Sequence, residues 1–400
     1  MLLEVKPRIG AAAACHICGA QVSAHEVLWQ GIHICGRYHC GYCGGNFVED
    51  LPVGQALFTP YRVTGDGLIL GDDSAMEWFG KPLRDSLQNP SQNESIGFRV
   101  EIRRAVANVV VLNCVDFLYG HCVLKLLNAE EHRGDASPGL VVIVPSFLRW
   151  MVPEYAAEVW DVDISLATAQ RFFPALHRRI TAELDRFESV RISSARSHPR
   201  EFDITNFTGV PRHDFSLPDY RITFVWRADR LWIGEGLIAR GFRKLGLRGL
   251  LLRHQQRKVC ELFSGLRKSF PKASFTVAGL GHETVFPSWI RDQRTTSFDT
   301  EAEIKACRIY SESRIVIGVH GSNMLLPSAH AGMAIDLMPA ERWSNMAQDI
   351  LYQQKDFCGD QRVAAFRFRY MPIEVSARTL EKMIVSMSRS FAEASKAFSC

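Results

Sequence analysis

Length and composition describe a globular chain with more than one domain. It has 400 residues, of which 47% are hydrophobic and 22% are charged. These fractions are close to the averages for soluble globular proteins, and at roughly 150 residues per domain the length predicts two or three domains. A disordered chain, a collagen and a charge-rich coiled coil are excluded. The 47 Lys+Arg against 43 Asp+Glu give a net charge of only +4, so charge gives no reason to expect nucleic acid as a partner.

Cysteine is unevenly distributed along the chain. Five of the eleven cysteines fall in the first 43 residues, where two C-x-x-C-G motifs occur. Each motif can bring two thiolates onto one tight turn, and the glycine relieves the backbone there. We therefore expect residues 1–50 to form a zinc-ribbon-like module with a structural Zn²⁺ bound by Cys15, Cys18, Cys40 and Cys43. Because four thiolates close the coordination sphere, this ion is expected to hold the fold and to take no part in catalysis.

Other uses of these cysteines stay open. A redox-active dithiol and ordinary buried thiols are the alternatives, and Cys35, His33 or His39 could replace one ligand. An odd, clustered number of cysteines fits a reducing compartment better than a disulfide framework. Residues 1–14 are interrupted by charges and proline, so no signal peptide is expected. The longest apolar runs have the length of strands and predict no membrane span, so a cytoplasmic protein is expected.

The rest of the chain alternates between two apolar patterns. Residues 51–95 are rich in proline and glycine and are expected to form an irregular linker. Beyond them, strands are predicted at 108–112, 140–144, 221–226, 274–278, 314–319 and 334–338, and helices at 117–129, 154–160, 176–187, 249–263, 299–310 and 323–331. Such alternation predicts right-handed βαβ units in a doubly wound sheet. Two blocks of it predict an α/β protein with two Rossmann-like domains, residues 96–212 and 213–400, joined by a proline-rich segment.

A polar, glycine-containing loop directly follows the strand predicted at residues 314–319. Ligands of open α/β sheets bind at the carboxyl ends of strands. Two glycines there would allow close backbone approach, and amides at the start of a helix can hold a phosphate. The loop residues that could contact a ligand are Gly318, His320, Gly321, Ser322 and Asn323. The alternative is a polar turn that only packs one strand against its helix.

Three further strand ends carry polar side chains. Arg227 and Arg230 follow a strand, where two guanidinium groups could bind a diphosphate. A glycine-rich turn ending in Glu283 follows the next strand. In the first block, Asp116 and His121 follow a buried strand. Each of these groups could instead belong to an ordinary turn, a helix cap or the surface.

Three segments together resemble a known enzyme family. Residues 318–339, GVHGSNMLLPSAHAGMAIDLMP, resemble the signature of family-61 glycosyltransferases, in which a Gly-x-His-Gly loop leads into a helix and then a strand with an acidic residue. Residues 119–124, YGHCVL, resemble the family's upstream Tyr-x-His-Trp-Leu-Leu segment. Arg227-Ala-Asp-Arg230 resembles its arginine-bearing strand end. The resemblance spans roughly residues 100–345 and leaves the cysteine-rich segment outside.

The resemblance implies a glycosyltransferase-B fold and an inverting sugar transfer in the cleft between two domains. The C-terminal domain would hold a nucleotide-sugar, with a UDP-sugar favoured, and the N-terminal domain a glycan or other hydroxyl acceptor. Arg227 and Arg230 would neutralise the diphosphate, and the His320 loop would bind the donor. Asp336 stands where the family usually has Glu, near the donor ribose. His121 matches the family's histidine on the acceptor side.

The same resemblance suggests the chemistry of transfer. A base would take the proton of the acceptor hydroxyl while its oxygen attacks the anomeric carbon, and His121, Asp116 and His320 are the candidates. No Asp-x-Asp motif follows a strand of the C-terminal block, so no catalytic metal is expected, and arginines would stabilise the leaving diphosphate. The acceptor, sugar and nucleotide stay open. Polysaccharide biosynthesis by a hexosyl- or pentosyltransferase is the expectation at family level.

Two residues depart from the family pattern. Cys122 replaces the usual Trp after the histidine, and Lys125 replaces an acidic residue. These departures keep a second hypothesis open, a non-catalytic zinc-ribbon interaction protein with a degenerate transferase body. A third hypothesis, a nucleic-acid binder, rests on Arg-rich stretches at 171–200 and 240–258. Acidic residues are interspersed in the first of these, which favours a solvated helix face.

Overall fold

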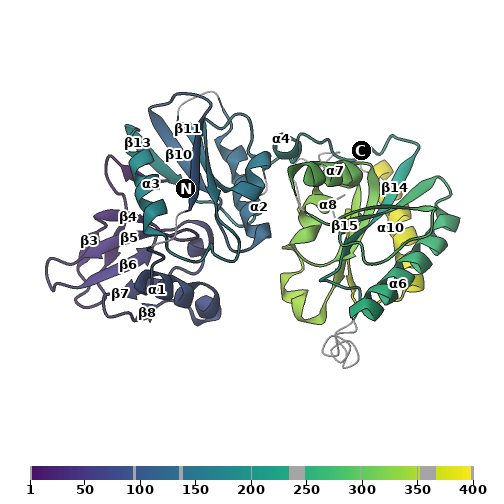
Figure 1. Ribbon diagram of the computed structural model, residues 1–400, viewed down its shortest axis with the longest axis horizontal. Coiled ribbons are helices and arrows are strands. Elements are labelled where there is room, and N and C mark those ends of the chain that lie inside the picture. The colour runs from purple at the N-terminus through teal and green to yellow at the C-terminus, as the bar shows by residue number, and fades with distance from the viewer. Residues whose placement is uncertain are drawn as a thin grey trace. The chain divides into compact units, whose positions relative to one another are not determined.

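The computed structural model describes residues 2–92, 96–134, 138–199, 201–233, 248–297, 299–348, 350–351 and 366–397. The chain divides into two compact units, Met1–Pro199 and Arg200–Cys400, called here the N-terminal and the C-terminal unit. Both mix helices with β-sheets, as Figure 1 shows, and this confirms the predicted α/β class. Among the described residues, no helix combines the length and the apolar character that crossing a membrane requires.

The N-terminal unit is built on a six-stranded sheet with the order β1-β13-β10-β11-β12-β9. Its strands are β1 (Leu2–Lys6), β9 (Gly97–Ile102), β10 (Asn108–Asn113), β11 (Gly139–Pro145), β12 (Glu158–Asp163) and β13 (Ser189–Ser193). The four central strands are parallel, and β1 and β9 add antiparallel edges. Strand β11 is buried at every residue, as a parallel strand covered on both faces should be.

Helices and short turns connect these strands. They are η4 (Asn128–His132), η5 (Ser146–Met151), α2 (Tyr119–Leu127) and α3 (Pro174–Leu184). Helix α2 contacts β10 and β11. Helix α3 places Leu176, Ile180 and Leu184 in one core cluster with residues of β10, β11 and β12.

A cysteine module, the region from β2 to β8, follows the edge strand β1. It holds the hairpin β2 (Ala12–Ala14) with β3 (Gln21–Ser23), and an antiparallel sheet of β4 (Glu26–Trp29), β5 (Ile34–His39), β6 (Asn46–Asp50), β7 (Arg62–Thr64) and β8 (Ile69–Leu70). The short helix η1 (Gly54–Leu57) lies between β6 and β7, and η2 (Asp73–Ala75), η3 (Met76–Gly80) and α1 (Lys81–Gln88) follow β8. Residues 51–95, predicted to be irregular, thus carry two strands and several helical turns.

The module and the large sheet of the N-terminal unit share one hydrophobic core. Leu28, Trp29 and Phe47 of the module belong to the same buried cluster as Val109 and Ile143 of the sheet. Helix α3 also touches β4. The module is therefore packed into the unit, so its stability and that of the sheet depend on one another.

The C-terminal unit contains a six-stranded sheet in which every pairing is parallel. Its strands are β14 (Tyr220–Arg227), β15 (Ala273–Leu280), β16 (Ile290–Thr295), β17 (Ser313–Val319), β18 (Met333–Met338) and β19 (Phe368–Pro372), in the order β16-β15-β14-β17-β18-β19. Numbered along the chain, this order is 3-2-1-4-5-6. The direction of winding reverses between β14 and β17.

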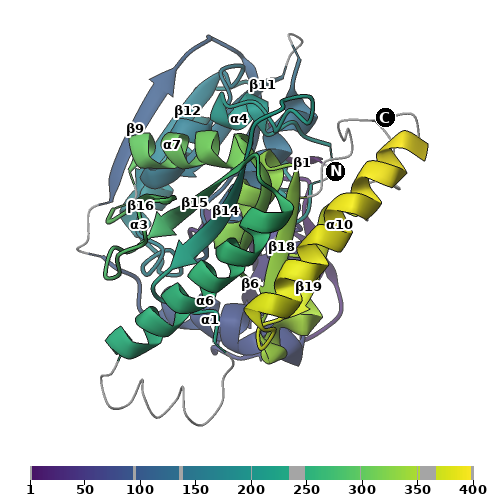
Figure 2. The same ribbon diagram turned by 90° about the vertical axis from the view of Figure 1, so that its right-hand side faces the viewer.

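Helices cover both faces of this sheet. The described helices of this unit are α4 (Thr205–Thr208), α6 (Arg248–Ser269), α7 (Thr300–Ser311), η6 (Ser322–Met324), α8 (Leu325–His330), η7 (Ala340–Asn345) and α10 (Ala377–Ala397). Figure 2 shows α6 and α10 side by side across one face. Alternate residues of β14 face opposite ways: Phe224 and Trp226 pack in the cluster that includes α6 and α10. Val225 packs with Tyr310 of α7.

The central strands of both units lie where the apolar runs predict them. One predicted element is wrong: residues 154–160 do not form a helix, because Glu158–Asp163 is strand β12. There the chain pairs with β11 on one side and β9 on the other. Six or seven residues are too few to separate a buried strand from a buried helical turn by periodicity.

Two buried histidines predict an acid-sensitive C-terminal unit. His213 donates from Nδ1 to the Ser311 carbonyl, 3.0 Å away, and His330 is fully buried. Burial lowers the pKa of each to about 4, against about 6.5 in an unfolded chain. Their contribution to stability is therefore complete above pH about 6.5 and is lost as the pH falls toward 4. Measured by urea unfolding, the free energy of unfolding should fall by about 3 kcal/mol per histidine between pH 6.5 and pH 4.

The control for this prediction is His213→Asn, whose amide nitrogen stands close to the position of Nδ1 and can still donate to Ser311, and which removes the titrating group. This variant should flatten the pH dependence by about half. An unchanged dependence in the variant would contradict the assignment to His213.

Candidate functional site

The four predicted metal ligands lie together in the cysteine module. The sulfur atoms of Cys15, Cys18, Cys40 and Cys43 are all within 4.8 Å of one another. The Sγ atoms of Cys15 and Cys43 are 3.5 Å apart, and those of Cys18 and Cys40 are 3.6 Å apart. A disulfide needs about 2.05 Å, whereas thiolates about 2.3 Å from a tetrahedral zinc lie nearly 4 Å apart. The four cysteines are thus placed to bind one metal ion such as zinc.

The two turns that carry these cysteines have the same backbone structure. Gly19 donates to the Cys15 carbonyl at 2.9 Å, and Gly44 donates to the Cys40 carbonyl at 2.8 Å. Both glycines have a positive φ, 74° and 76°, which other residues adopt at a cost. This explains why each motif continues into glycine.

The backbone of these turns favours the thiolate at Cys15 and Cys40, whereas burial and the neighbouring thiols raise the pKa of Cys43. Hydrogen bonds from the backbone of Cys18 and Ile17 lower the pKa of Cys15 to about 6. A hydrogen bond from the backbone of Cys43 likewise lowers the pKa of Cys40. Deprotonated sulfur is the form that binds a metal.

The three alternative ligands are placed elsewhere. His33 Nδ1 lies 2.8 Å from Asp50 Oδ1, and the Cys35 thiol donates to the same oxygen at 3.5 Å. His39 pairs with the side chain of Asn46 at 2.8 Å. Within the described chain, the cluster that could hold a metal consists of the four cysteines of the two motifs alone.

Asp116 and His121 meet at the carboxyl end of β10, as part of a buried charged group. Asp116 Oδ1 lies 3.2 Å from His121 Nδ1, and its Oδ2 lies 2.8 Å from the ammonium of Lys125. The side chain of Asp116 is 2% exposed and that of His121 is 35% exposed. Burial by itself raises the pKa of Asp116, but Lys125 and His121 outweigh it and hold the pKa well below its usual range. Asp116 is therefore a carboxylate that orients the more exposed His121.

Lys125, a departure from the pattern of the resembled family, is buried and belongs to this charged group. Its ammonium also donates to the Val115 carbonyl at 2.9 Å, and Lys125 thus supplies the counter-charge of Asp116. Cys122 is buried and donates to the Asp116 carbonyl at 3.4 Å. A single lysine among apolar residues of a helix, as in HCVLKLL, was the available signal of a buried ion pair.

The cysteine module reaches this same strand end. The Gly54 amide donates to the Ser194 carbonyl at 2.7 Å, and a Cβ on Gly54 would lie 3.2 Å from Lys125 Cε. The Asn113 side chain, at the end of β10, donates to the Gly31 carbonyl at 2.8 Å.

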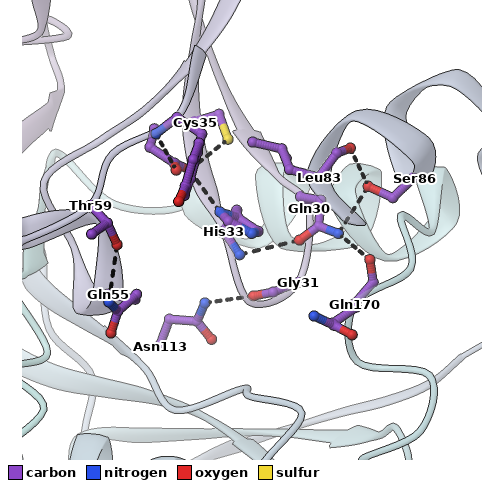
Figure 3. A network of polar contacts seen from close by, with 12 residues as sticks. Gln30, Gly31, His33, Cys35, Gln55, Thr59, Leu83, Ser86, Asn113 and Gln170 are labelled. Atoms are coloured by element: carbon purple, nitrogen blue, oxygen red, sulfur yellow. Dashed lines mark hydrogen bonds and ion pairs between the residues drawn. The ribbon is translucent and has the colours of Figure 1, made fainter. Parts of the chain in front are cut away.

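Figure 3 shows the module's Gln30–Gly31 turn held in place beside this strand end. The Gln30 side-chain amide donates to the Gln170 carbonyl at 2.6 Å and to the Ser86 hydroxyl at 3.1 Å. Gly31 has a φ of 142°, and a Cβ there would lie 2.8 Å from the Ala169 carbonyl oxygen. Sequence reasoning did not find this contact between the module and the strand end.

In the C-terminal unit, the ends of β14 and β17 bring two predicted segments together. The Arg230 guanidinium donates to the His320 carbonyl at 3.0 Å and reaches Asn323 Oδ1 at 3.5 Å. Gly321 has a φ of 145°, and a Cβ there would lie 1.1 Å from Arg230 Nη1. No other residue fits at position 321 while Arg230 stays in place. Asn323 also donates to the Val319 carbonyl at 3.2 Å.

His320 and Asp336 form a buried pair. Their Nδ1 and Oδ2 atoms are 2.6 Å apart, and the side chains are 4% and 0% exposed. The pair follows from the sheet register, in which Gly318 of β17 lies opposite Asp336 of β18. Asp336 thus lies within its strand and contacts His320, whereas the resemblance assigns it to a donor ribose. Gly318 is closely packed, since a Cβ there would lie 2.3 Å from Met324 Sδ.

The remaining predicted residues lie around the same sheet edge. Arg227 makes two hydrogen bonds of 2.8 Å to the carboxylate of Asp229, which is more exposed than the arginine. Glu283 Oε1 is 3.5 Å from an Arg248 nitrogen, and a Cβ on Gly281 would lie 2.9 Å from the Ala228 Cβ. Ser322 begins the short helix η6. The ends of β14, β15 and β17 therefore converge, as the parallel sheet predicts.

Comparisons with protein-family models, with curated proteins and with solved structures found no match to this chain. The function therefore has to be inferred from the residues and their geometry.

Proposed function

We propose that the protein is an inverting glycosyltransferase whose C-terminal unit binds a nucleotide-sugar and whose N-terminal unit binds the hydroxyl acceptor. The observation that carries the proposal is the Arg230–His320 contact beside Gly321, at the carboxyl ends of β14 and β17. In a parallel sheet with the order 3-2-1-4-5-6, the switch point between strands 1 and 4 is where Rossmann-like domains bind nucleotides. A guanidinium beside a close-approach glycine is suited to a diphosphate. The favoured donor is a UDP-sugar.

The N-terminal unit supports the role of acceptor domain. Its parallel strands β13-β10-β11-β12 have the chain order 4-1-2-3, which favours a second Rossmann-like sheet. The Asp116–His121 pair lies at the corresponding switch point, after β10. The metal bound by the four cysteines would be a structural zinc, and it takes no part in the reaction.

Transfer would proceed by direct displacement. His121, with Nδ1 facing the Asp116 carboxylate, takes the proton of the acceptor hydroxyl on Nε2. The acceptor oxygen forms a bond to the anomeric carbon, and the bond from that carbon to the diphosphate oxygen breaks. The nucleoside diphosphate leaves with the bonding electrons, and the guanidinium of Arg230 offsets its charge. The buried Asp116 stabilises the imidazolium, as a carboxylate does for a catalytic histidine.

Donor binding is tested by titrating UDP into the protein in a calorimeter. Arg230→Ala should lower the affinity for UDP by about 10- to 100-fold, because each charge-assisted hydrogen bond contributes about 1.5–3 kcal/mol. Arg227→Ala should lower it as well. The matched control is Arg308→Ala, since Arg308 is exposed in the last turn of α7, before the amino end of β17. Equal UDP affinity in all three variants would refute the donor site.

A second candidate is a non-catalytic interaction protein. It is favoured by Ile17 and Tyr42, which lie at the tips of the two cysteine turns and are 62% and 84% exposed. A panel of nucleotide-sugars separates the two candidates, because a transferase should hydrolyse at least one donor slowly in the absence of acceptor.

A further inference from the structure

An aromatic platform lies next to His121 in the N-terminal unit. We use this name for Trp78, Phe117, Tyr119 and Phe147. The rings of Trp78 and Phe117 are stacked with their centroids 6.4 Å apart, and the Phe117 ring lies 6.3 Å from that of His121. Tyr119 stacks on Phe147 at 6.0 Å. These residues come from η3, from the loop and helix start after β10, and from the turn after β11.

Two of the four aromatic residues are exposed, and Phe117 and Tyr119 are half-buried. Trp78 is 61% exposed and Phe147 is 38% exposed. Tryptophan is usually well buried, and exposed apolar patches commonly mark binding sites. Trp78 is also held in place, since its carbonyl accepts a hydrogen bond of 2.7 Å from Gln170, and the next residue, Phe79, is buried and packs edge-on against Phe117 at 5.7 Å.

Polar groups border the platform on one side. His121 contacts Phe117 and is held by the buried Asp116. A surface that combines exposed aromatic side chains with a fixed hydrogen-bonding group matches one class of ligand well. Sugar rings present C–H groups on a face and hydroxyl groups at the rim, so the face can stack on an aromatic ring while a hydroxyl reaches His121.

We propose that the aromatic platform binds a sugar ring of the acceptor, with Trp78 as its main contact. This inference rests on the proposed function, because it gives the acceptor a chemical class, a glycan. The neighbouring His121 would then meet a hydroxyl of that glycan. Trp78 lies in residues 51–95, outside the segments that resemble glycosyltransferases. The choice of acceptor would therefore depend on a part of this chain that the resemblance does not cover. A protein partner is the competing occupant, and the experiment separates it.

The test is saturation-transfer NMR with the full-length protein and the methyl β-glycosides of glucose, galactose, N-acetylglucosamine and xylose. At least one glycoside should receive saturation, strongest at the protons of a single ring face. Trp78→Ala should weaken its binding by roughly tenfold, in line with the strength of aromatic contacts, and Trp78→Phe should restore part of it. The matched control is Trp343→Ala, because Trp343 is 39% exposed in the C-terminal unit.

UDP titration of the same variants separates this inference from the proposed function. Glycoside binding that depends on Trp78 supports the platform even if UDP does not bind, in which case the transferase proposal fails alone. Glycoside binding that survives Trp78→Ala, or no saturation of any glycoside, overturns the platform even if UDP binds. An unchanged melting temperature of the N-terminal unit, which contains Trp78, would show that Trp78→Ala is folded. If the wild type self-associates in sedimentation, Trp78→Ala does not, and no glycoside binds, the occupant is a second copy of this chain and the inference is overturned.

Discussion

Replacing Lys125 with methionine should destabilise the N-terminal unit by about 3–5 kcal/mol, because it leaves the carboxylate of Asp116 buried without its partner. For a unit of this size, the loss corresponds to a fall in melting temperature on the order of 10 °C. Calorimetry of the wild type and the variant measures it. If the protein is the transferase proposed above, sugar transfer should fall as well, because Asp116 without Lys125 binds a proton more readily and a protonated Asp116 does not stabilise an imidazolium at His121.

Two further variants decide whether the ion pair is the cause. Lys125→Met combined with Asp116→Asn removes both charges and should recover most of the lost stability, because a neutral pair carries no uncompensated charge. Lys81→Met breaks an exposed pair with Glu77 and should cost at most about 1 kcal/mol. If Lys125→Met were no more harmful than Lys81→Met, the buried ion pair would not support the site.

Removing the metal should unfold the cysteine module and lower the melting temperature of the N-terminal unit by 10 °C or more. Binding of a structural zinc contributes about 10 kcal/mol or more to the folding of small zinc domains, and here the module shares its core with the large sheet. We expect one zinc per chain by elemental analysis, lost after chelation or in Cys40→Ser.

Cys35→Ser is the matched control for metal loss. Cys35 is buried in the same module and bonds to Asp50, outside the metal-binding group, so this variant should keep its zinc. Retention of zinc in Cys40→Ser would contradict the assignment of Cys40 as a ligand, and loss of zinc in Cys35→Ser would indicate that Cys35 is a ligand. If the wild type held less than one zinc per chain and all four thiols of the two motifs reacted freely, the assignment of a zinc site would be wrong.

The strands that sequence reasoning found are those buried on both faces. Runs such as LVVIV in β11 are apolar at every position because helices or the module cover both sides. Strand β16, with the sequence IRDQRT, was missed because it is an edge strand with two exposed residues and several charged ones. Its Arg294 is buried by contacts with Trp226 and Phe286, which local pattern cannot reveal.

In the candidate sites, too, local sequence pattern predicts the positions of residues along the chain but not their tertiary contacts. Strand-end positions of Arg230, His320 and Asp116 were predictable, because parallel strands end at one edge. The partners of these residues were not predictable from the sequence. His320 pairs with Asp336 because of the register of β17 against β18. Asp116 pairs with Lys125 because α2 lies next to β10. The catalytic and donor-binding roles of these residues stay predictions until the variants are measured.

The edge strand β1 limits how the protein can be dissected. β1 pairs with β13 over Leu2 to Lys6, and the cysteine module begins only after it. A truncated chain that starts at residue 51 would therefore lose a strand of the large sheet together with the metal ligands. The uncovered side of β13 would offer unpaired amides and carbonyls to other chains, which is a common cause of aggregation. Point variants that keep the first fifty residues are thus the sound way to separate the module's contribution from that of the sheet.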